Sequence, residues 1–346
     1  MRHRRLIITG AVFAAAIVGV AFFHALEYVV IPNPLQGDFR VLQPATENSA
    51  HIIFTGDVFL GRDVERRMDN RGTAATLSLF NDLPETDALI VNFEAAIPEV
   101  HQPTPDFGWQ FSVRSDIVAE LAAVRVTHAG LANNHTFDHG SAGYAHTRQT
   151  LTSVGIEPFG HPSRINHDLS VSSIETEFGS IAVVGMHTLY GVPSLRSIDD
   201  TIASIEPTPE RIVAYVHWGE EYELEHNAQQ RAFAEQLVDL GFDLIVGHHP
   251  HVVQGIEMIG EVPVVYSLGN TIFDQYFSTD VQQGLLLSYT ASSDGDALEF
   301  VPITSLGTPA APRFMESENA ADFLQDVASR GSELVAPAVS WGQLEW

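Results

Sequence analysis

The sequence contains no cysteine and no lysine, and each absence removes a class of chemistry. Without cysteine there is no disulfide framework, no thiolate nucleophile and no thiolate metal ligand. Without lysine there is no Schiff-base lysine and no P-loop lysine. A metal site in this chain must therefore use His, Asp, Glu and Asn side chains, which favours Mn, Fe, Zn or Mg over softer metals.

Positive charge is also scarce. The 17 basic residues are all arginine and face 44 acidic residues, which gives a formal net charge of −27. Because the chain has no basic stripe to replace the counterions of a phosphate backbone, we expect no nucleic-acid partner. No Gly-x-Ser-x-Gly sequence is present, so nothing supports a serine hydrolase.

The first part of the chain, residues 1–31, has the features of a membrane anchor. Residues 6–23 are 18 residues without a charge, just long enough to span a bilayer, and three arginines precede them. The arginines predict a cytoplasmic N-terminus and an exported remainder. Two phenylalanines stand where a signal-peptide cleavage site would need small residues. We therefore expect a single-pass membrane protein; secretion after cleavage is the alternative.

Residues 32–50 are rich in Pro, Asn and Gln and are predicted to form a linker. Strand and helix patterns then alternate through residues 51–305, which predicts an α/β domain. The expected strands lie at 51–57, 87–94, 126–132, 181–184, 211–216, 243–246, 262–268, 284–289 and 298–303, and the expected helices at 115–124, 141–153 and 227–240. Residues 306–346 are expected to be a peripheral tail with one short helix.

A histidine-rich loop, Gly247-His248-His249-Pro250-His251, follows one of these apolar strands. Pro250 ends the strand and favours an extended His249. On an extended backbone, His249 and His251 would lie on the same side of the chain. Two imidazoles on one stiff loop suit a divalent metal, although solvated loop histidines are an alternative.

Further ligand-type residues follow apolar strands in four other segments. They are Asp57, Glu94, the pair Asn134 and His135, and His217. In open α/β sheets, ligands collect outside the carboxyl ends of the strands. Each residue alone could be a turn, cap or core residue, but their shared position predicts a site for one or two divalent metal ions.

The chain resembles the CapA / poly-γ-glutamate capsule biosynthesis family, which belongs to the calcineurin-like metallophosphatase superfamily. Six motifs occur in the family's order: GDVFLGR (56–62), VNFEAAI (91–97), LANNHTFDHG (131–140), HWGEEY (217–222), GHHPHVVQ (247–254) and YSLGNTIFDQ (266–275). The resemblance covers about residues 51–305. It implies a four-layer α/β/β/α sandwich with a dinuclear-type site, preceded by an N-terminal membrane anchor.

The resemblance also implies roles for the ligand-type residues. Asp57 would hold the first metal, Glu94 would bridge, Asn134 and His217 would hold the second metal, and His249 and His251 would be divided between the two. The superfamily has a histidine two residues after the first aspartate, where this chain has Phe59. We therefore expect the first metal to bind weakly or not at all.

His135 would face the substrate and donate a proton to the leaving group. Asp138 could orient that imidazole, or it could be the N-cap of the next helix. Arg62 could hold an anionic substrate group through two hydrogen bonds, or it could be a surface arginine. Residues expected to position the ligands are Asn92, Gln254, Asn270 and Asp274.

Two functions follow from these features. One is a metal-dependent hydrolase or transferase outside the membrane, acting on phosphoester or γ-glutamyl bonds. The other is a non-catalytic subunit of a capsule synthesis or export complex that grips an anionic polymer; the chain's own negative charge would make this binding metal-dependent. The Asn134-His135 pair favours the first and Phe59 the second. In a weaker third interpretation, Trp109 and Trp218 stack sugars, although we expect both in the core.

Overall fold

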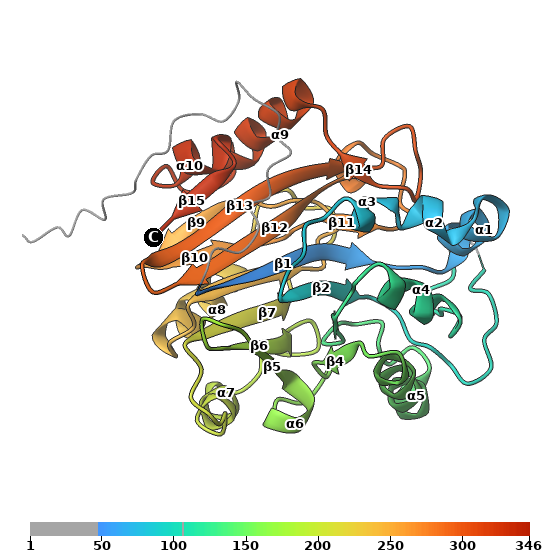
Figure 1. Cartoon of the computed structure of the whole chain (residues 1–346), viewed down its shortest axis with the longest axis horizontal. Helices are drawn as coiled ribbons and strands as arrows, with labels where there is room; N and C mark the ends of the chain where they lie inside the picture. The colour runs from blue at the N-terminus through green and yellow to red at the C-terminus, as the bar shows by residue number, and fades with distance from the viewer. Residues whose placement is uncertain (1–47, 106) are drawn as a thin grey trace, which may run out of the picture.

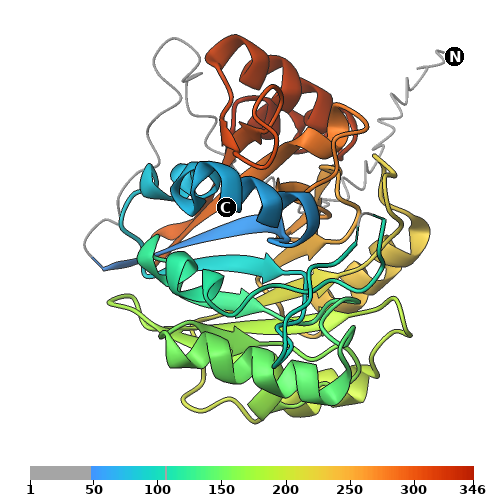
Figure 2. The same ribbon diagram turned by 90° about the vertical axis from the view of Figure 1, so that its right-hand side faces the viewer.

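The computed structural model describes residues 48–346 except Asp106. Two β-sheets face each other and helices pack on their outer sides, which confirms the α/β prediction (Figure 1, Figure 2). The predicted anchor and most of the predicted linker lie outside the described residues. Within 48–346, no helix has both the length and the apolar character needed to cross a bilayer.

The first sheet has nine strands among the described residues, in the order β14-β13-β12-β1-β2-β3-β4, with β11 beside β1 and β15 beside β13. These strands are β1 (Ser49–Val58), β2 (Ala88–Phe93), β3 (His128–Gly130), β4 (Glu157–Phe159), β11 (Asn270–Ile272), β12 (Gln283–Ser292), β13 (Gly295–Thr304), β14 (Arg313–Phe314) and β15 (Gln343–Glu345). Strands β1 to β4 and β11 are parallel, so their carboxyl ends meet at one edge.

The second sheet has six strands in the part of the chain described, in the order β5-β6-β7-β8-β10-β9. They are β5 (Val171–Glu175), β6 (Ser180–His187), β7 (Arg211–His217), β8 (Leu244–His248), β9 (Ile256–Ile259) and β10 (Val262–Val265). The three parallel strands β6, β7 and β8 are in register at their last residues, where His187 pairs with His217 and His217 with His248.

Helices lie on the outer faces of the sheets and, near the C-terminus, against the core between them. The helices are α1 (Arg62–Arg71), α2 (Thr73–Thr76), α3 (Ser78–Asn81), α4 (Ile117–Ala123), α5 (Gly140–Ser153), α6 (His167–Ser170), α7 (Leu195–Ile202), α8 (Ala228–Asp239), α9 (Ser317–Ser329) and α10 (Ala336–Ser340).

The layers follow from the alternation of side chains along β1 and β2. Ile52 and Phe54 point into the core shared with the second sheet, whereas Ile53 points into the core under α1, α4 and α5. On the other outer side, a third core joins the second sheet to α7 and α8. Strands buried on both faces need near-continuous apolar sequences, which is the pattern these segments show.

Helix α8 begins where the sequence predicts and fixes the loop before it. The Asn227 side chain accepts the backbone N–H groups of Gln229 and Gln230, and the Gln230 side chain accepts the N–H of Asn227. This reciprocal cap stabilises the first turn by about 1 kcal/mol. Gln230 Nε2 also donates to Gln254 Oε1 at 2.9 Å, which ties the helix to the segment after the histidine loop.

Residues 306–346 differ from the expected peripheral tail with one short helix. They form α9, α10, β14 and β15, and the side chains of Phe323, Leu324 and Val327 are buried in the core between the sheets. Arg330 NH1 donates to the carbonyl of Val253 at 2.7 Å, so α9 also contacts the segment just after the histidine loop. The sequence prediction missed the apolar face of α9 because the segment as a whole is polar and rich in alanine.

Candidate metal centre

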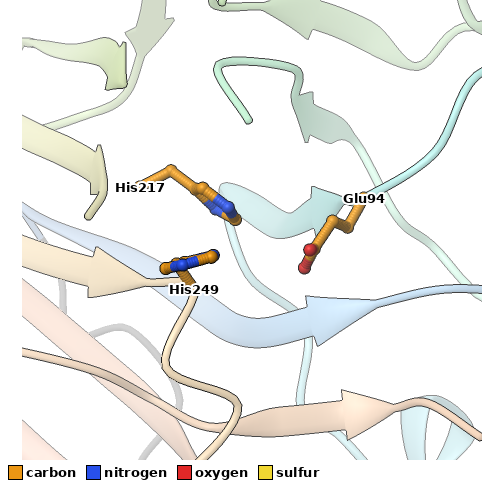
Figure 3. Close-up of side chains that lie close together, drawn as sticks. All are labelled: Glu94, His217 and His249. Atoms are coloured by element: carbon orange, nitrogen blue, oxygen red, sulfur yellow. The ribbon is translucent and has the colours of Figure 1, made fainter. Parts of the chain in front are cut away.

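Ligand-type side chains from the two sheets meet at the edge where the parallel strands end. One cluster contains Glu94, His217 and His249, and a second contains Asp57, Glu94 and His251. Within each cluster the ligand atoms lie within 4.8 Å of one another, and all of these residues are buried. Figure 3 shows the Glu94 carboxylate and the rings of His217 and His249 pointing toward one another. Either cluster could hold a divalent metal ion.

Asp57, at the end of β1, is held in its ionised form. Asn92 Nδ2 donates to Asp57 Oδ1 at 2.7 Å, and His251 Nδ1 lies 3.1 Å from Asp57 Oδ2. Burial opposes ionisation, but the hydrogen bond and charge of His251, the charge of His248 and the hydrogen bond from Asn92 outweigh it and lower the pKa of Asp57. Asp57 therefore offers a charged oxygen ligand.

Glu94, shared by the two clusters, has an unsatisfied carboxylate. Neither of its oxygens has a hydrogen-bond partner among the described residues, and Oε1 lies 3.8 Å from His251 Nε2 and 3.9 Å from His135 Nε2. Burial, followed by the charges of Asp57, Glu221 and Asp138, raises the pKa of Glu94 well above its ordinary value. A buried carboxylate without a partner is costly unless a cation binds it. The donor set therefore fits a metal ion.

We expect Glu94→Gln to stabilise the metal-free protein at high pH. A carboxyl group with a raised pKa takes up a proton on folding, so the free energy of unfolding falls as pH rises from about 4.5 through the raised pKa. Denaturant unfolding in chelator should show a gain of about 1–3 kcal/mol at pH 8, which shrinks as pH falls toward 4.5. The exposed Glu99→Gln is the matched control. An unchanged pH dependence would contradict this account of Glu94.

The histidines of the first cluster are neutral, which is the form that binds metal. Burial, followed by the neighbouring His249, holds the pKa of His217 well below its usual range. Burial also lowers the pKa of His249 to about 3. Asn134 Oδ1 lies 2.8 Å from His217 Nε2. Adjacent ligands at about 2.1 Å from a metal ion are about 3 Å apart, so this spacing fits two ligands of one ion.

The histidine loop does not have the extended backbone that the sequence suggests. His249 has φ 100° and His251 has φ 60°, both in the left-handed region that residues other than glycine rarely adopt. Such strain costs about 1–3 kcal/mol for each residue and persists only where the surrounding structure imposes it. The turn sends His249 to one cluster and His251 to the other, which an extended loop would not do.

Phe59, at the position where the resemblance suggests a histidine in the superfamily, is part of an aromatic stack. Its ring is fully buried, stacks on Phe111 with centroids 4.3 Å apart, and lies 5.4 Å from the ring of Phe273. Phe111 in turn stacks on His135 at 3.6 Å. Phe59 therefore offers no ligand to the Asp57 cluster and instead supports the stack that holds His135.

We expect Phe59→His to raise the metal content of the purified chain toward one additional ion. The ring of Phe59 lies against Phe273, whose ring centroid is 4.6 Å from that of His251, so an imidazole at 59 would lie near the Asp57 cluster. Elemental analysis after dialysis measures the stoichiometry, and Phe59→Leu controls for loss of the stack. An unchanged stoichiometry would show that Phe59 does not limit occupancy of this cluster.

His135 and Asp138 form a hydrogen-bonded pair. His135 Nδ1 lies 2.8 Å from Asp138 Oδ2, which also accepts the backbone N–H of Phe111 at 2.6 Å. Helix α5 has His139 as its N-cap, without a side-chain hydrogen bond, so Asp138 is not that cap. The pairing leaves His135 Nε2 facing Glu94 and the centre.

Arg62 and two residues predicted to position ligands have other partners. Arg62 forms a bidentate ion pair with Asp274, and its NH1 donates to the carbonyl of Gly108 at 3.3 Å. These bonds engage the guanidinium that was expected to bind substrate. Gln254 Nε2 donates to the carbonyls of Glu223 and Glu225, so it shapes the loop after β7. In contrast, Asn92 and Asn270 do contact ligand residues, because Asn270 Oδ1 lies 3.0 Å from His251 Nδ1.

The sequence interpretation missed buried polar groups beside the centre. His187 Nδ1 donates to the carbonyl of Pro162 at 3.0 Å, and its Nε2 is buried without a partner in the described chain. The Tyr215 hydroxyl is likewise buried and unpaired within residues 48–346. A histidine at the end of an apolar strand, the signal that identified His217, also marks His187. Nothing in the sequence marks Tyr215, which looks like an ordinary core residue.

Comparison with known proteins shows the family of this chain. Residues 51–275 match the family described as "Bacterial capsule synthesis protein PGA_cap". The chain belongs to this family. It is 27% identical over 276 residues to the PGA biosynthesis protein CapA of Bacillus subtilis, covering 75% of this chain and 72% of that protein. It is 26% identical over 275 residues to the capsule biosynthesis protein CapA of Bacillus anthracis, covering 73% and 66%.

A more distant relative, a probable polyglutamine synthesis accessory protein of Mycobacterium tuberculosis, is 25% identical over 213 residues, covering 55% of this chain and 56% of that protein. The chain is therefore a CapA-like member of the poly-γ-glutamate capsule protein family, as the six motifs predict. The family match covers the segments that supply Asp57, Glu94, Asn134, His217 and the histidine loop.

Proposed function

We propose that this chain is an exported, membrane-anchored protein of poly-γ-glutamate or capsule-polymer synthesis, and that its metal centre hydrolyses a phosphoester or γ-glutamyl bond. The observation that carries the proposal is the buried Glu94 carboxylate, which two donor clusters share and which accepts no hydrogen bond from any described residue. The layering of the fold, with the centre at the carboxyl edge of its parallel strands, supports a metallophosphatase-like arrangement.

The positions of the residues assign them to two metal ions and to the substrate. Glu94, His217, His249 and Asn134 would hold one ion, while Asp57 and His251, with Glu94, would hold a second, weaker one. A bound Mn, Fe, Zn or Mg ion would acidify water and offset negative charge on the substrate. His135 presents Nε2 to the same space and donates a proton to the leaving group, because Asp138 fixes its Nδ1–H.

The test is metal-dependent turnover by the purified full-length chain. We expect hydrolysis of an aryl phosphodiester or of a γ-glutamyl peptide to stop in chelator and to return with one of these four metals. Elemental analysis on the same sample should give about one tightly bound ion per chain, since the Asp57 cluster lacks the histidine that Phe59 replaces. Turnover of neither substrate by metal-loaded protein would contradict a hydrolase.

A non-catalytic role in the same process is the alternative, and Arg62 favours it. Because Arg62 is paired with Asp274, its guanidinium is not free to stabilise negative charge that develops on a substrate. In this role the ion would bind a carboxylate of the polymer, and other subunits of a capsule-synthesis complex would act on it. Pull-down of the polymer with and without chelator tests this role. Binding that is unchanged by chelator would exclude metal-mediated binding.

A further inference from the structure

The cleft that opens from the metal centre is walled by aromatic side chains that face water. The cleft has a volume of about 390 Å³, and His135 and His251 line it together with the aromatic residues. Around its mouth, Phe107 is 94% exposed, Trp109 82% and Phe277 66%. Trp109 was expected in the core, as was Trp218, which is indeed buried. Exposed aromatic rings beside a polar centre are typical of a ligand site.

The exposed apolar side chains are concentrated at this edge of the molecule. Of the nine large apolar residues exposed in the described chain, eight lie in segments that follow the carboxyl ends of strands. These eight are Val100, Phe107, Trp109, Tyr190, Val192, Leu195, Tyr222 and Phe277. Scattered surface residues would be spread over both ends of the sheets, so a concentration at one edge indicates a contact surface there.

Backbone and side-chain contacts hold Tyr222 in place and bring Phe277 against it. Tyr222, like Phe107, has a left-handed φ, at 68° and 63° respectively. The Tyr222 N–H donates to the carbonyl of Pro250 at 2.8 Å, and its hydroxyl accepts a hydrogen bond from Gln275 Nε2 at 3.0 Å. Its ring meets the ring of Phe277 edge to face, with centroids 5.0 Å apart. Strain held by several contacts is a feature of binding sites.

Charge in the outer cleft does not suit a polyanion. Arg62 is paired with Asp274 and Arg66 with Asp63, while Glu221 adds a further carboxylate to the wall. The whole chain carries −27. An aliphatic tail would strip water from these carboxylates at a cost. A neutral polyhydroxylated ring avoids both problems, because its hydroxyls donate to carboxylate and amide oxygens and its C–H face packs on an aromatic ring.

We propose that this aromatic cleft binds a neutral sugar ring whose phosphate ester reaches the metal centre. The inference rests on the proposed function and narrows its substrate class to a sugar phosphate. Trp109, Tyr222 and Phe277 pack on the ring, and Glu221 and Gln275 accept and donate hydrogen bonds at its edge. Arg62 and its partner Asp274 form the floor between the ring and the phosphate.

Calorimetric titration of the full-length, Mn²⁺-loaded chain with glucose 1-phosphate and with methyl phosphate tests the sugar subsite. The two esters share a phosphate and differ in the ring, so the ratio of their affinities measures the ring's contribution. We expect glucose 1-phosphate to bind at least tenfold more tightly. Trp109→Ala and Phe277→Ala should each reduce the ratio to below three without changing the affinity for methyl phosphate. Trp109→Phe should preserve the ratio, and Leu334→Ala, an exposed position outside the cleft, should leave it unchanged.

Other outcomes overturn the proposal. Equal affinities, including equal absence of binding, exclude a ring subsite, as does an equal loss for both esters in Trp109→Ala. Tighter binding of dodecyl phosphate than of glucose 1-phosphate would assign the cleft to an aliphatic chain. Methyl phosphate titrated with and without chelator reports on the metal centre alone. Chelator-sensitive methyl phosphate binding with no preference for the sugar ester would therefore reject the subsite and leave the proposed function standing.

Discussion

Replacing His135 by alanine is expected to lower turnover of an aryl phosphodiester by about 10²–10⁴-fold while the metal content stays the same. His135 does not belong to either donor cluster, and its Nε2 lies 3.9 Å from Glu94 Oε1. Its Nδ1 is held by Asp138, and its ring is stacked on Phe111. A side chain held on two sides, with one nitrogen free toward the centre, is placed to transfer a proton.

The controls separate this role from folding. His139→Ala removes a histidine from the same segment and should leave turnover within a few-fold of the wild type. Asp138→Asn keeps the size of the side chain but removes its charge, and should cost less than His135→Ala while changing the pH profile. Full activity in His135→Ala would remove this residue from the mechanism. A matching loss of metal would instead make it a ligand.

The second large effect is expected for His249→Ala. This variant should bind the metal at least about 100-fold more weakly, and turnover should fall because the metal is lost. Loss of a residue that merely orients a ligand costs about 10–100-fold in affinity, so loss of a ligand should cost more. His249 is buried and neutral beside Glu94 and His217, which leaves few other groups to replace it. Competition with a fluorescent chelator measures the affinity.

His51→Ala is the matched control for removing a buried histidine. His51 lies near the start of β1, away from Asp57 at the other end, and its Nε2 is 2.8 Å from the Ser288 hydroxyl. This variant should lose stability but bind metal with wild-type affinity. Unchanged metal affinity in His249→Ala would exclude the Glu94–His217–His249 cluster as the tight site.

The sequence interpretation succeeded where a signal is local. A buried strand has to be apolar, and a polar side chain just after it has to lie at the strand's carboxyl end, so Asp57, Glu94 and His217 could be identified one segment at a time. Asn227 and Gln230 marked the start of α8 in the same way, because a cap bonds within its own turn.

The sequence could not show the partners that lie far along the chain. Arg62 looked free to bind substrate because Asp274, its partner, is 212 positions away. Gln254 looked like a support for a metal ligand, but it binds the loop after β7. Trp109 and Trp218 are alike as residues, yet one is 82% exposed and the other 1%, because burial is a property of the assembled layers.

The sequence by itself determined the α/β class, the order of the strands along the chain, the family, and the positions of Asp57, Glu94 and His217 at strand ends, since each of these follows from patterns a few residues long. Only the tertiary structure decided that Glu94 is shared between two clusters, that Phe59 holds His135 through a stack with Phe111, and that exposed aromatic rings surround the mouth of the cleft. The physical reason is that ligand geometry and burial depend on distances between segments. Those distances are set only when the two sheets pack against each other.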